Sequence, residues 1–281
     1  MRSFTSMRRV PRLAVVGAVV AVAGVAVAVA MAANPSTDRS FTPQKADQVT
    51  NVDVLRQQIA NYYGDPGKTG NFAADSNYAR EAESVAKDGA NWLGARTSVA
   101  NKAIVLDVDD TTLATWNYEI FSNWAFNPTT NGQFVTDQRF PAVPGMVAMV
   151  NQAKAEGYAV FFLTGRGAAQ EAATLGNLTS DGIGVDAGYP TPTALPNGED
   201  GLFTKPPVGS YPAYLNSPEF CGPSITAGVS CPTIRYKSGV RAHIESQGYE
   251  IVGNFGDQFS DLNGGFADKP FKLPNPNYFL P

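Results

Sequence analysis

The stretch AIVLDVDDT, residues 103–111, decides the fold of this chain. It begins with a short, continuous apolar run, which is typical of a strand buried on both faces of a parallel sheet. Acidic residues alternate where the run ends, at Asp107 and Asp109, and Thr111 follows them. A hydrophobic core alone does not need such side chains. We therefore expect this strand to end at a polar site.

Apolar runs and helical patterns alternate along the chain after this strand. Three further strands are predicted at 158–164, 233–237 and 249–256. Helices are predicted at 143–157, 168–182 and 238–248, and the stretch DQFSDL, residues 257–262, follows the last strand. This alternation is typical of βαβ units and predicts an α/β fold with a doubly wound parallel sheet. The irregular stretch 183–232 is too long for a plain connection, so we expect it to cover or shape a site as a small cap.

Before the first strand, residues 51–63 and 77–95 place apolar side chains at helical spacing, with a dense turn signal between them. They predict a helical N-terminal extension over 50–100, followed by the core over 101–281. The polar segment 34–49 is expected to be a linker. Residues 50–281 are thus predicted to act as one domain.

The first 33 residues have a different composition. Four arginines precede an uncharged apolar run from Leu13 to Ala33, which ends with the small-residue pattern Ala-Met-Ala at 30–32. This arrangement is typical of an export signal, so we expect a secreted or otherwise extracytoplasmic protein. A retained membrane anchor is the alternative, because the run is just long enough to span a bilayer.

Removal of this leader would take away four arginines and no acid, so the formal net charge would change from −4 to −8. Such an acidic protein is a poor candidate for binding nucleic acid or an anionic membrane through charge. We expect a small-molecule partner, and membrane contact only through an uncleaved leader.

Cys221 and Cys231 are the only cysteines and lie ten residues apart in a Gly/Pro-rich segment. In an exported protein such a pair is more often a disulfide than a metal site. Two cysteines without nearby histidines also cannot complete a zinc tetrahedron. We therefore predict a disulfide between them.

Polar side chains mark two more strand ends besides that of 103–108. Thr164 and Arg166 follow the second predicted strand, and Asp257 and Asp261 follow the fourth. A single aspartate at a strand end is usually a turn former or a helix N-cap. In parallel sheets, however, ligands bind at the carboxyl ends of the strands, so these side chains can converge on one crevice.

Clustered carboxylates repel one another unless a cation neutralises them. Four aspartates at one edge therefore predict a hard divalent ion, most simply Mg²⁺. Thr164, Arg166 and one of the lysines would bind an anion beside this ion. A metal ion with carboxylates, a hydroxyl and a cation is suited to phosphoryl transfer.

The motifs DVDDT, FLTGR, YKSGVR and GNFGDQFSD occur in this order. In this they resemble the four motifs of the haloacid-dehalogenase (HAD) phosphatase superfamily. The closer resemblance is to its subfamily IIIB acid phosphatases, which include plant vegetative storage proteins and secreted bacterial relatives. The C-terminal KLPNPNYFLP is similar to the tail of that branch. The likeness covers about residues 50–281 and implies a Rossmann-like core.

The resemblance implies a role for each matching residue. Asp107 matches the nucleophile that forms a phosphoaspartate, and Asp109 matches the general acid and base. The residues implied to bind the phosphate are Thr111, Thr164, Gly165, Arg166 and Lys237. The Mg²⁺ ligands implied are Asp107, the backbone carbonyl of Asp109, Asp257 and Asp261. The motif does not say whether Arg166 contacts phosphate or a cap residue.

These roles imply a Mg²⁺-dependent acid phosphatase acting on phosphomonoesters. A non-catalytic storage or binding protein on the same fold is one alternative, although Asp107, Asp109 and Lys237 are intact. A phosphotransferase with an alcohol acceptor is another, since it would share every catalytic residue. The single histidine, His243, excludes phosphatases that need several histidines.

Overall fold

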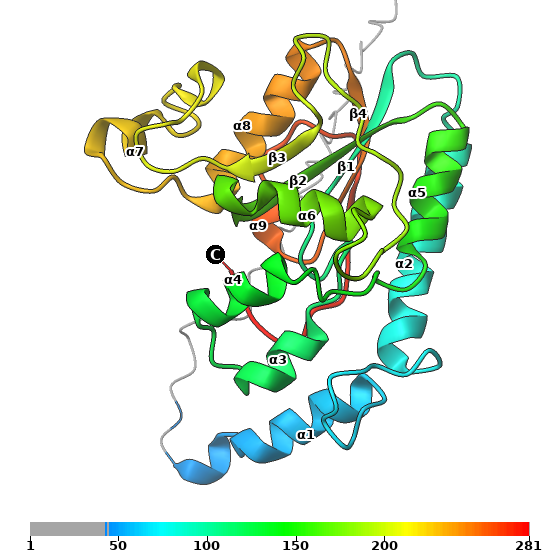
Figure 1. The fold of residues 1–281 in the computed structure, drawn as a ribbon, viewed down its shortest axis with the longest axis vertical. Coiled ribbons are helices and arrows are strands. Elements are labelled where there is room, and N and C mark those ends of the chain that lie inside the picture. Colours follow the sequence, from blue (N-terminus) through cyan, green and yellow to red (C-terminus); the bar gives the residue numbers. More distant parts are fainter. Residues whose placement is uncertain (1–42, 44, 281) are drawn as a thin grey trace, which may run out of the picture. The chain divides into compact units, whose positions relative to one another are not determined.

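Five parallel strands form the centre of the computed structural model, which describes residues 43 and 45–280. The strands are β1 (Lys102–Leu106), β2 (Ala159–Gly167), β3 (Leu202–Lys205), β4 (Glu250–Gly256) and β5 (Pro270–Lys272). Their spatial order is β3-β2-β1-β4-β5, and Figure 1 labels the first four of them. The chain runs outward from β1 to β3 and then continues on the other side of β1, so the topological switch point lies between β1 and β4. The predicted doubly wound parallel sheet is confirmed.

One predicted strand is wrong. Residues 233–237 do not form a strand but begin helix α8 (Thr233–Ser246), and the third strand is β3, inside the stretch predicted to be irregular. Tyr236, Val240 and Ile244 lie four residues apart and pack against the sheet, which is a helical period. The short run TIRYK alone was too brief to show this period.

Strand β5 was also not predicted. It has three residues, begins with a proline and lies at the edge of the sheet, so it carries little strand signal.

The helices before the sheet agree with the prediction. They are α1 (Val52–Tyr62) and α2 (Asn77–Gly94), and the side chains of Asn51 and Ser76 cap their N-termini. In α2, the indole Nε1 of Trp92 donates a hydrogen bond of 3.0 Å to the carbonyl of Val252 in β4. The helical extension is therefore attached directly to the sheet.

The predicted helices of the core are present as α5 (Met146–Ala155), α6 (Glu171–Thr179) and α8. Further helices of the described residues were not predicted: α3 (Trp116–Ser122), α4 (Pro128–Thr136), α7 (Gly222–Ala227) and α9 (Phe259–Leu262). Short 3-10 helices occur at Ala46–Gln48, Ala168–Gln170 and Ala213–Leu215.

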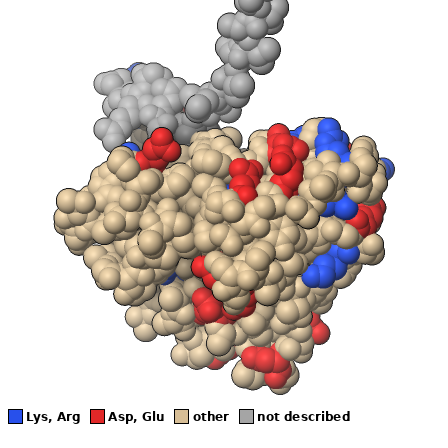
Figure 2. All heavy atoms as spheres, turned by 90° about the horizontal axis from the view of Figure 1, so that it is seen from above, with Lys and Arg blue, Asp and Glu red and all other residues tan. Residues whose placement is uncertain are grey.

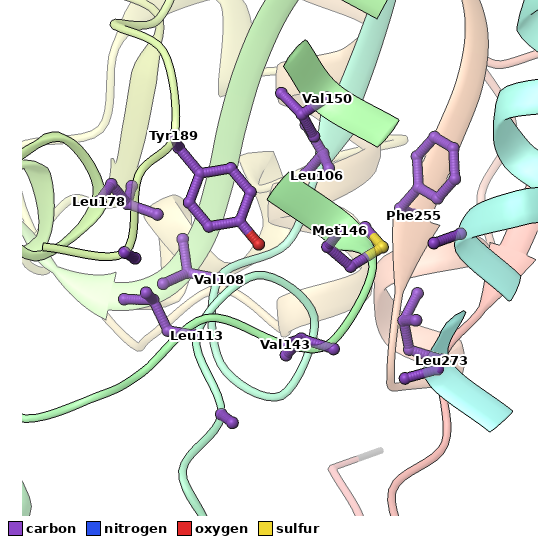
Figure 3. Packing of buried hydrophobic residues seen from close by; sticks show 14 of the residues in the cluster. Leu106, Val108, Leu113, Val143, Met146, Val150, Leu178, Tyr189, Phe255 and Leu273 are labelled. Atoms are coloured by element: carbon purple, nitrogen blue, oxygen red, sulfur yellow. The ribbon is translucent and has the colours of Figure 1, made fainter. Parts of the chain in front are cut away.

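The sheet separates two apolar layers. In one layer, Leu106 of β1 and Phe255 of β4 pack near Met146 and Val150 of α5 (Figure 3). Helices α2 and α5 lie side by side along this layer, and α8 belongs to the other one (Figure 1). Because side chains alternate along a strand, Ala103 and Val105 face the α8 layer. Asp107 continues this parity, which directs its carboxylate toward α8.

Among the described residues, no helix is both long and apolar enough to cross a membrane. The predicted leader, 1–33, and most of the predicted linker, 34–49, lie outside the described residues. On the face shown in Figure 2, acidic and basic side chains are scattered among uncharged ones.

The predicted disulfide between Cys221 and Cys231 is present, with a Cα–Cα distance of 5.2 Å. Both cysteines are buried in the α8 layer. The bond encloses α7, so it fixes the segment between β3 and α8.

We expect the loss of this disulfide to lower the free energy of unfolding by about 2–3 kcal/mol, because the closed loop is short. Urea unfolding of the oxidised protein, with and without reductant, measures this change. The variant with both cysteines replaced by serine should show the lower stability and no response to reductant. Equal stability of the oxidised and reduced proteins would contradict the prediction.

Candidate active site

Asp107 lies at the carboxyl end of β1 and faces helix α8. Its backbone N–H donates to the carbonyl of Phe255 in β4, at 2.9 Å, which continues the β1–β4 ladder past the last strand residue. Its carboxylate is buried and accepts a hydrogen bond from Nζ of Lys237. Lys237 thus reaches the site from the first turns of α8, not from a strand end.

Lys237 also contacts a second carboxylate. Its Nζ lies 2.7 Å from Oδ1 of Asp261, and its side chain is only 3% exposed. Asp261 belongs to α9, directly after β4, and its Oδ2 accepts from the backbone N–H of Gln258 at 2.8 Å. The β4–α9 turn therefore holds this carboxylate in place.

Three buried carboxylates meet at the switch point of the sheet. One oxygen from each of Asp107, Asp257 and Asp261 lies within 4.8 Å of the other two. Asp257 also accepts from the hydroxyl of Thr111 at 3.3 Å and from the amide of Asn275 at 2.6 Å. Carboxylate oxygens are the ligands that hard divalent cations prefer. The donor set fits such an ion.

The charges in this cluster do not balance. Burial, then the charges of Asp261, Asp107 and Asp110, raise the pKa of Asp257 well above its ordinary value of 3.8. Burial, opposed by Lys237, raises the pKa of Asp107 to about 7. Burial alone would lower the pKa of Lys237, but Asp107 and Asp261 raise it overall. One lysine among three carboxylates leaves an excess of negative charge, which a bound cation would neutralise.

Asp109 is held by Arg166, which extends from the end of β2. Nη2 of Arg166 lies 2.7 Å from Oδ1 of Asp109, and its Nε lies 3.1 Å from Oδ2. The arginine side chain is 4% exposed, whereas that of Asp109 is 30% exposed. Asp109 therefore faces the accessible side of the site, with Arg166 behind it.

The tip of β2 completes the site. The hydroxyl of Thr164 is buried and accepts from the backbone N–H of Arg166 at 3.1 Å. Gly165 is exposed, and a Cβ built there would meet no atom within 4 Å. This leaves open space above the strand end, where an anion can approach the backbone.

A family comparison gives the wider context of this geometry. The family model described as "HAD superfamily, subfamily IIIB (Acid phosphatase)" matches residues 28–196 and 229–281. The chain belongs to this subfamily. The match confirms the resemblance inferred from the four motifs. The unmatched stretch between the two parts contains all of β3 and α7.

Among curated proteins, this chain is similar to the stem 28 kDa glycoprotein of Glycine max. The two are 33% identical over 157 residues, which cover 55% of this chain and 50% of that protein. It is similar to acid phosphatase 1 of Solanum lycopersicum, with 28% identity over 185 residues, 63% of this chain and 58% of that protein. Vegetative storage protein 2 of Arabidopsis thaliana is 46% identical over 54 residues, 19% of this chain and 20% of that protein. The chain spans about half the length of the first of these relatives.

Among solved structures, the class C acid phosphatase from Bacillus anthracis matches with a TM-score of 0.55 and 20% identity. The match covers 80% of this chain and 86% of that structure. At this identity the likeness shows the fold and nothing more.

Two residues of the candidate site were missed from the sequence. Asp110 is buried, has a positive φ of 53°, and accepts from the backbone N–H and hydroxyl of Thr115 at 2.9 and 2.6 Å. Asn275, in the C-terminal tail, donates to Asp257 and to Asp110. The place of Asp110 in DVDDT was a usable signal, but no spacing rule indicates Asn275.

Proposed function

We propose that this chain is a Mg²⁺-dependent acid phosphatase that hydrolyses phosphomonoesters through an aspartyl-phosphate on Asp107. The observation that carries the proposal is the buried contact between Asp107 and Lys237, at the edge where Asp257 and Asp261 converge. Family membership supports the reaction class.

The ligands of the ion in this proposal are Asp107, Asp257, Asp261 and the backbone carbonyl of Asp109. Bound there, Mg²⁺ supplies positive charge beside the phosphoryl oxygens. Lys237 offsets charge repulsion between Asp107 and a phosphate dianion in the same way. Thr111, Thr164 and Gly165 bind the remaining phosphate oxygens at the tips of β1 and β2, and Arg166 acts beside them by holding the carboxylate of Asp109.

The reaction then proceeds in two displacements. A carboxylate oxygen of Asp107 attacks phosphorus, the bond from phosphorus to the ester oxygen breaks, and Asp109 gives its proton to the leaving alcohol. Water next attacks phosphorus and passes a proton to Asp109, which frees Asp107 and inorganic phosphate. The ion pair with Arg166 positions Asp109 for both proton transfers.

Export is part of this proposal. The buried disulfide supports an oxidising compartment, because such bonds persist mainly outside the cytoplasm. The bond from Trp92 to β4 supports one domain over 50–281, in which a helical extension over 50–100 packs on a core over 101–281. The partner proposed is a small phosphomonoester.

Phosphate release from a generic aryl phosphate tests the proposal. The assay runs from acidic to neutral pH with Mg²⁺, or with a chelator in its place. Mg²⁺-dependent release supports it, and an added alcohol that becomes phosphorylated would indicate phosphotransfer instead. A folded protein that binds Mg²⁺ without turnover would favour a storage or binding protein, as the name of the Arabidopsis relative suggests for that protein.

In chelator, we expect the thermal midpoint to fall as the pH rises from about 5 to about 7.5. The pKa of Asp257 is higher in the folded protein than its ordinary value of 3.8, so the folded state binds more protons and loses stability as they dissociate. Excess Mg²⁺ should raise the midpoint more at pH 7.5 than at pH 5, because it binds the deprotonated carboxylates. Calorimetry at both pH values measures this.

Asp257→Asn is the control, since it should weaken both the pH dependence and the response to Mg²⁺. A midpoint in chelator that rises over the same pH range would contradict the charge imbalance described for this cluster.

A further inference from the structure

Glu119 is a buried acid whose carboxylate has no partner in the described part of the chain. Its side chain lies in α3, and the residue is only 8% exposed. Across residues 43 and 45–280, no donor or cation contacts its carboxylate, whereas its backbone carbonyl accepts from the hydroxyl of Ser122 at 3.3 Å and from the N–H of Trp124 at 3.1 Å. An ionised carboxylate in this position is costly unless something pairs with it.

The geometry of α3 directs this carboxylate toward the proposed active site. Thr115, at the N-cap of α3, binds Asp110 through both its N–H and its hydroxyl. The backbone N–H of Glu119 donates to the carbonyl of Thr115 at 3.1 Å, so the two residues are one helical turn apart and share a face. That face is the one turned to the DVDDT loop.

The electrostatics agree with this placement. Burial, then the charges of Asp110 and Asp109, raise the pKa of Glu119 to about 8. The charges that raise the pKa of Glu119 are therefore those of Asp109, which is the proposed general acid and base, and of its neighbour Asp110. Arg166 does not neutralise the charge of Glu119, because its guanidinium pairs with Asp109.

We propose that Glu119 binds an ammonium group on the leaving alcohol and so selects phosphoesters of amino alcohols. The inference rests on the proposed function, in which the leaving oxygen takes its proton from Asp109. A substituent a few atoms beyond that oxygen lies on the Asp109 side of the site, which Glu119 faces. An ammonium there would make charge-assisted hydrogen bonds to the carboxylate and supply its missing counter-charge.

The test compares O-phosphoethanolamine with n-propyl phosphate, which has the same chain length but a methyl group in place of the ammonium. The wild-type protein should favour phosphoethanolamine by about tenfold or more in kcat/KM, which corresponds to about 1.4 kcal/mol. In Glu119→Gln this ratio should fall toward one, mainly through a higher KM for phosphoethanolamine.

Glu83→Gln is the matched control, because it makes the same change at an exposed position of α2 and should keep the wild-type ratio. If the kcat/KM ratio of the two esters is near one in the wild-type protein, this result alone overturns the inference. A ratio in Glu119→Gln that equals the wild-type ratio also overturns it. If the wild type hydrolyses neither ester nor an aryl phosphate, the proposed function fails as well. Equal hydrolysis of both esters overturns only the role of Glu119.

Discussion

Asp107→Asn should lower phosphate release by about 10⁴-fold or more, the loss typical of removing a nucleophile. The amide keeps the shape of the carboxylate but is a poor nucleophile, so the first displacement fails. The change also removes one charge from a crowded cluster, so the metal-free variant should be at least as stable as the wild type. Steady-state assays with an aryl phosphate, together with urea unfolding, measure both effects.

Asp88→Asn, at an exposed position of α2, is the matched control and should retain activity. An Asp107→Asn protein that is folded and within tenfold of wild-type activity would mean that another group attacks phosphorus.

Lys237→Met should have the largest effect on stability. It removes the cation that contacts both Asp107 and Asp261 and leaves buried carboxylates unpaired. Breaking a buried ion pair from one side typically costs about 3–5 kcal/mol. We expect a loss of this size in chelator, partly restored by Mg²⁺, and a fall in kcat/KM of about 10²-fold or more, as when one charge-stabilising donor is lost.

Lys87→Met, on the exposed face of α2, controls for the loss of a lysine. Urea unfolding with chelator and with Mg²⁺ provides the comparison. If Lys237→Met were as stable as Lys87→Met in chelator, the inference that negative charge is in excess at the switch point would be wrong.

The sequence predicted the part of the site that lies at strand ends. Strands β1, β2 and β4 are apolar runs, and a carboxylate or hydroxyl directly follows or ends each run, so their convergence followed from the rules for parallel sheets. Lys237 was identified by its motif, but its element was wrong because α8 begins with the strand-like TIRYK. The lysine still reaches Asp107, since the first turns of α8 lie over the carboxyl end of β1.

Other features depend on contacts between distant segments. Asn275 reaches Asp257 only because β5 directs the tail back over the site, and three edge residues give almost no strand signal. The isolation of Glu119 is likewise a property of the packed structure, since the sequence cannot show that no cation lies beside a carboxylate. The pairing of Arg166 with Asp109 is another such contact, which the motif alone does not indicate.

The central claim is that Asp107 becomes phosphorylated during turnover. Rapid quenching of the wild-type protein with an aryl phosphate and Mg²⁺, followed by borohydride reduction, tests this directly, because borohydride converts an aspartyl-phosphate to homoserine. Peptide mass spectrometry should find homoserine at position 107, dependent on substrate and absent from Asp107→Asn. Turnover without homoserine at 107, or with homoserine at another aspartate, would contradict the account.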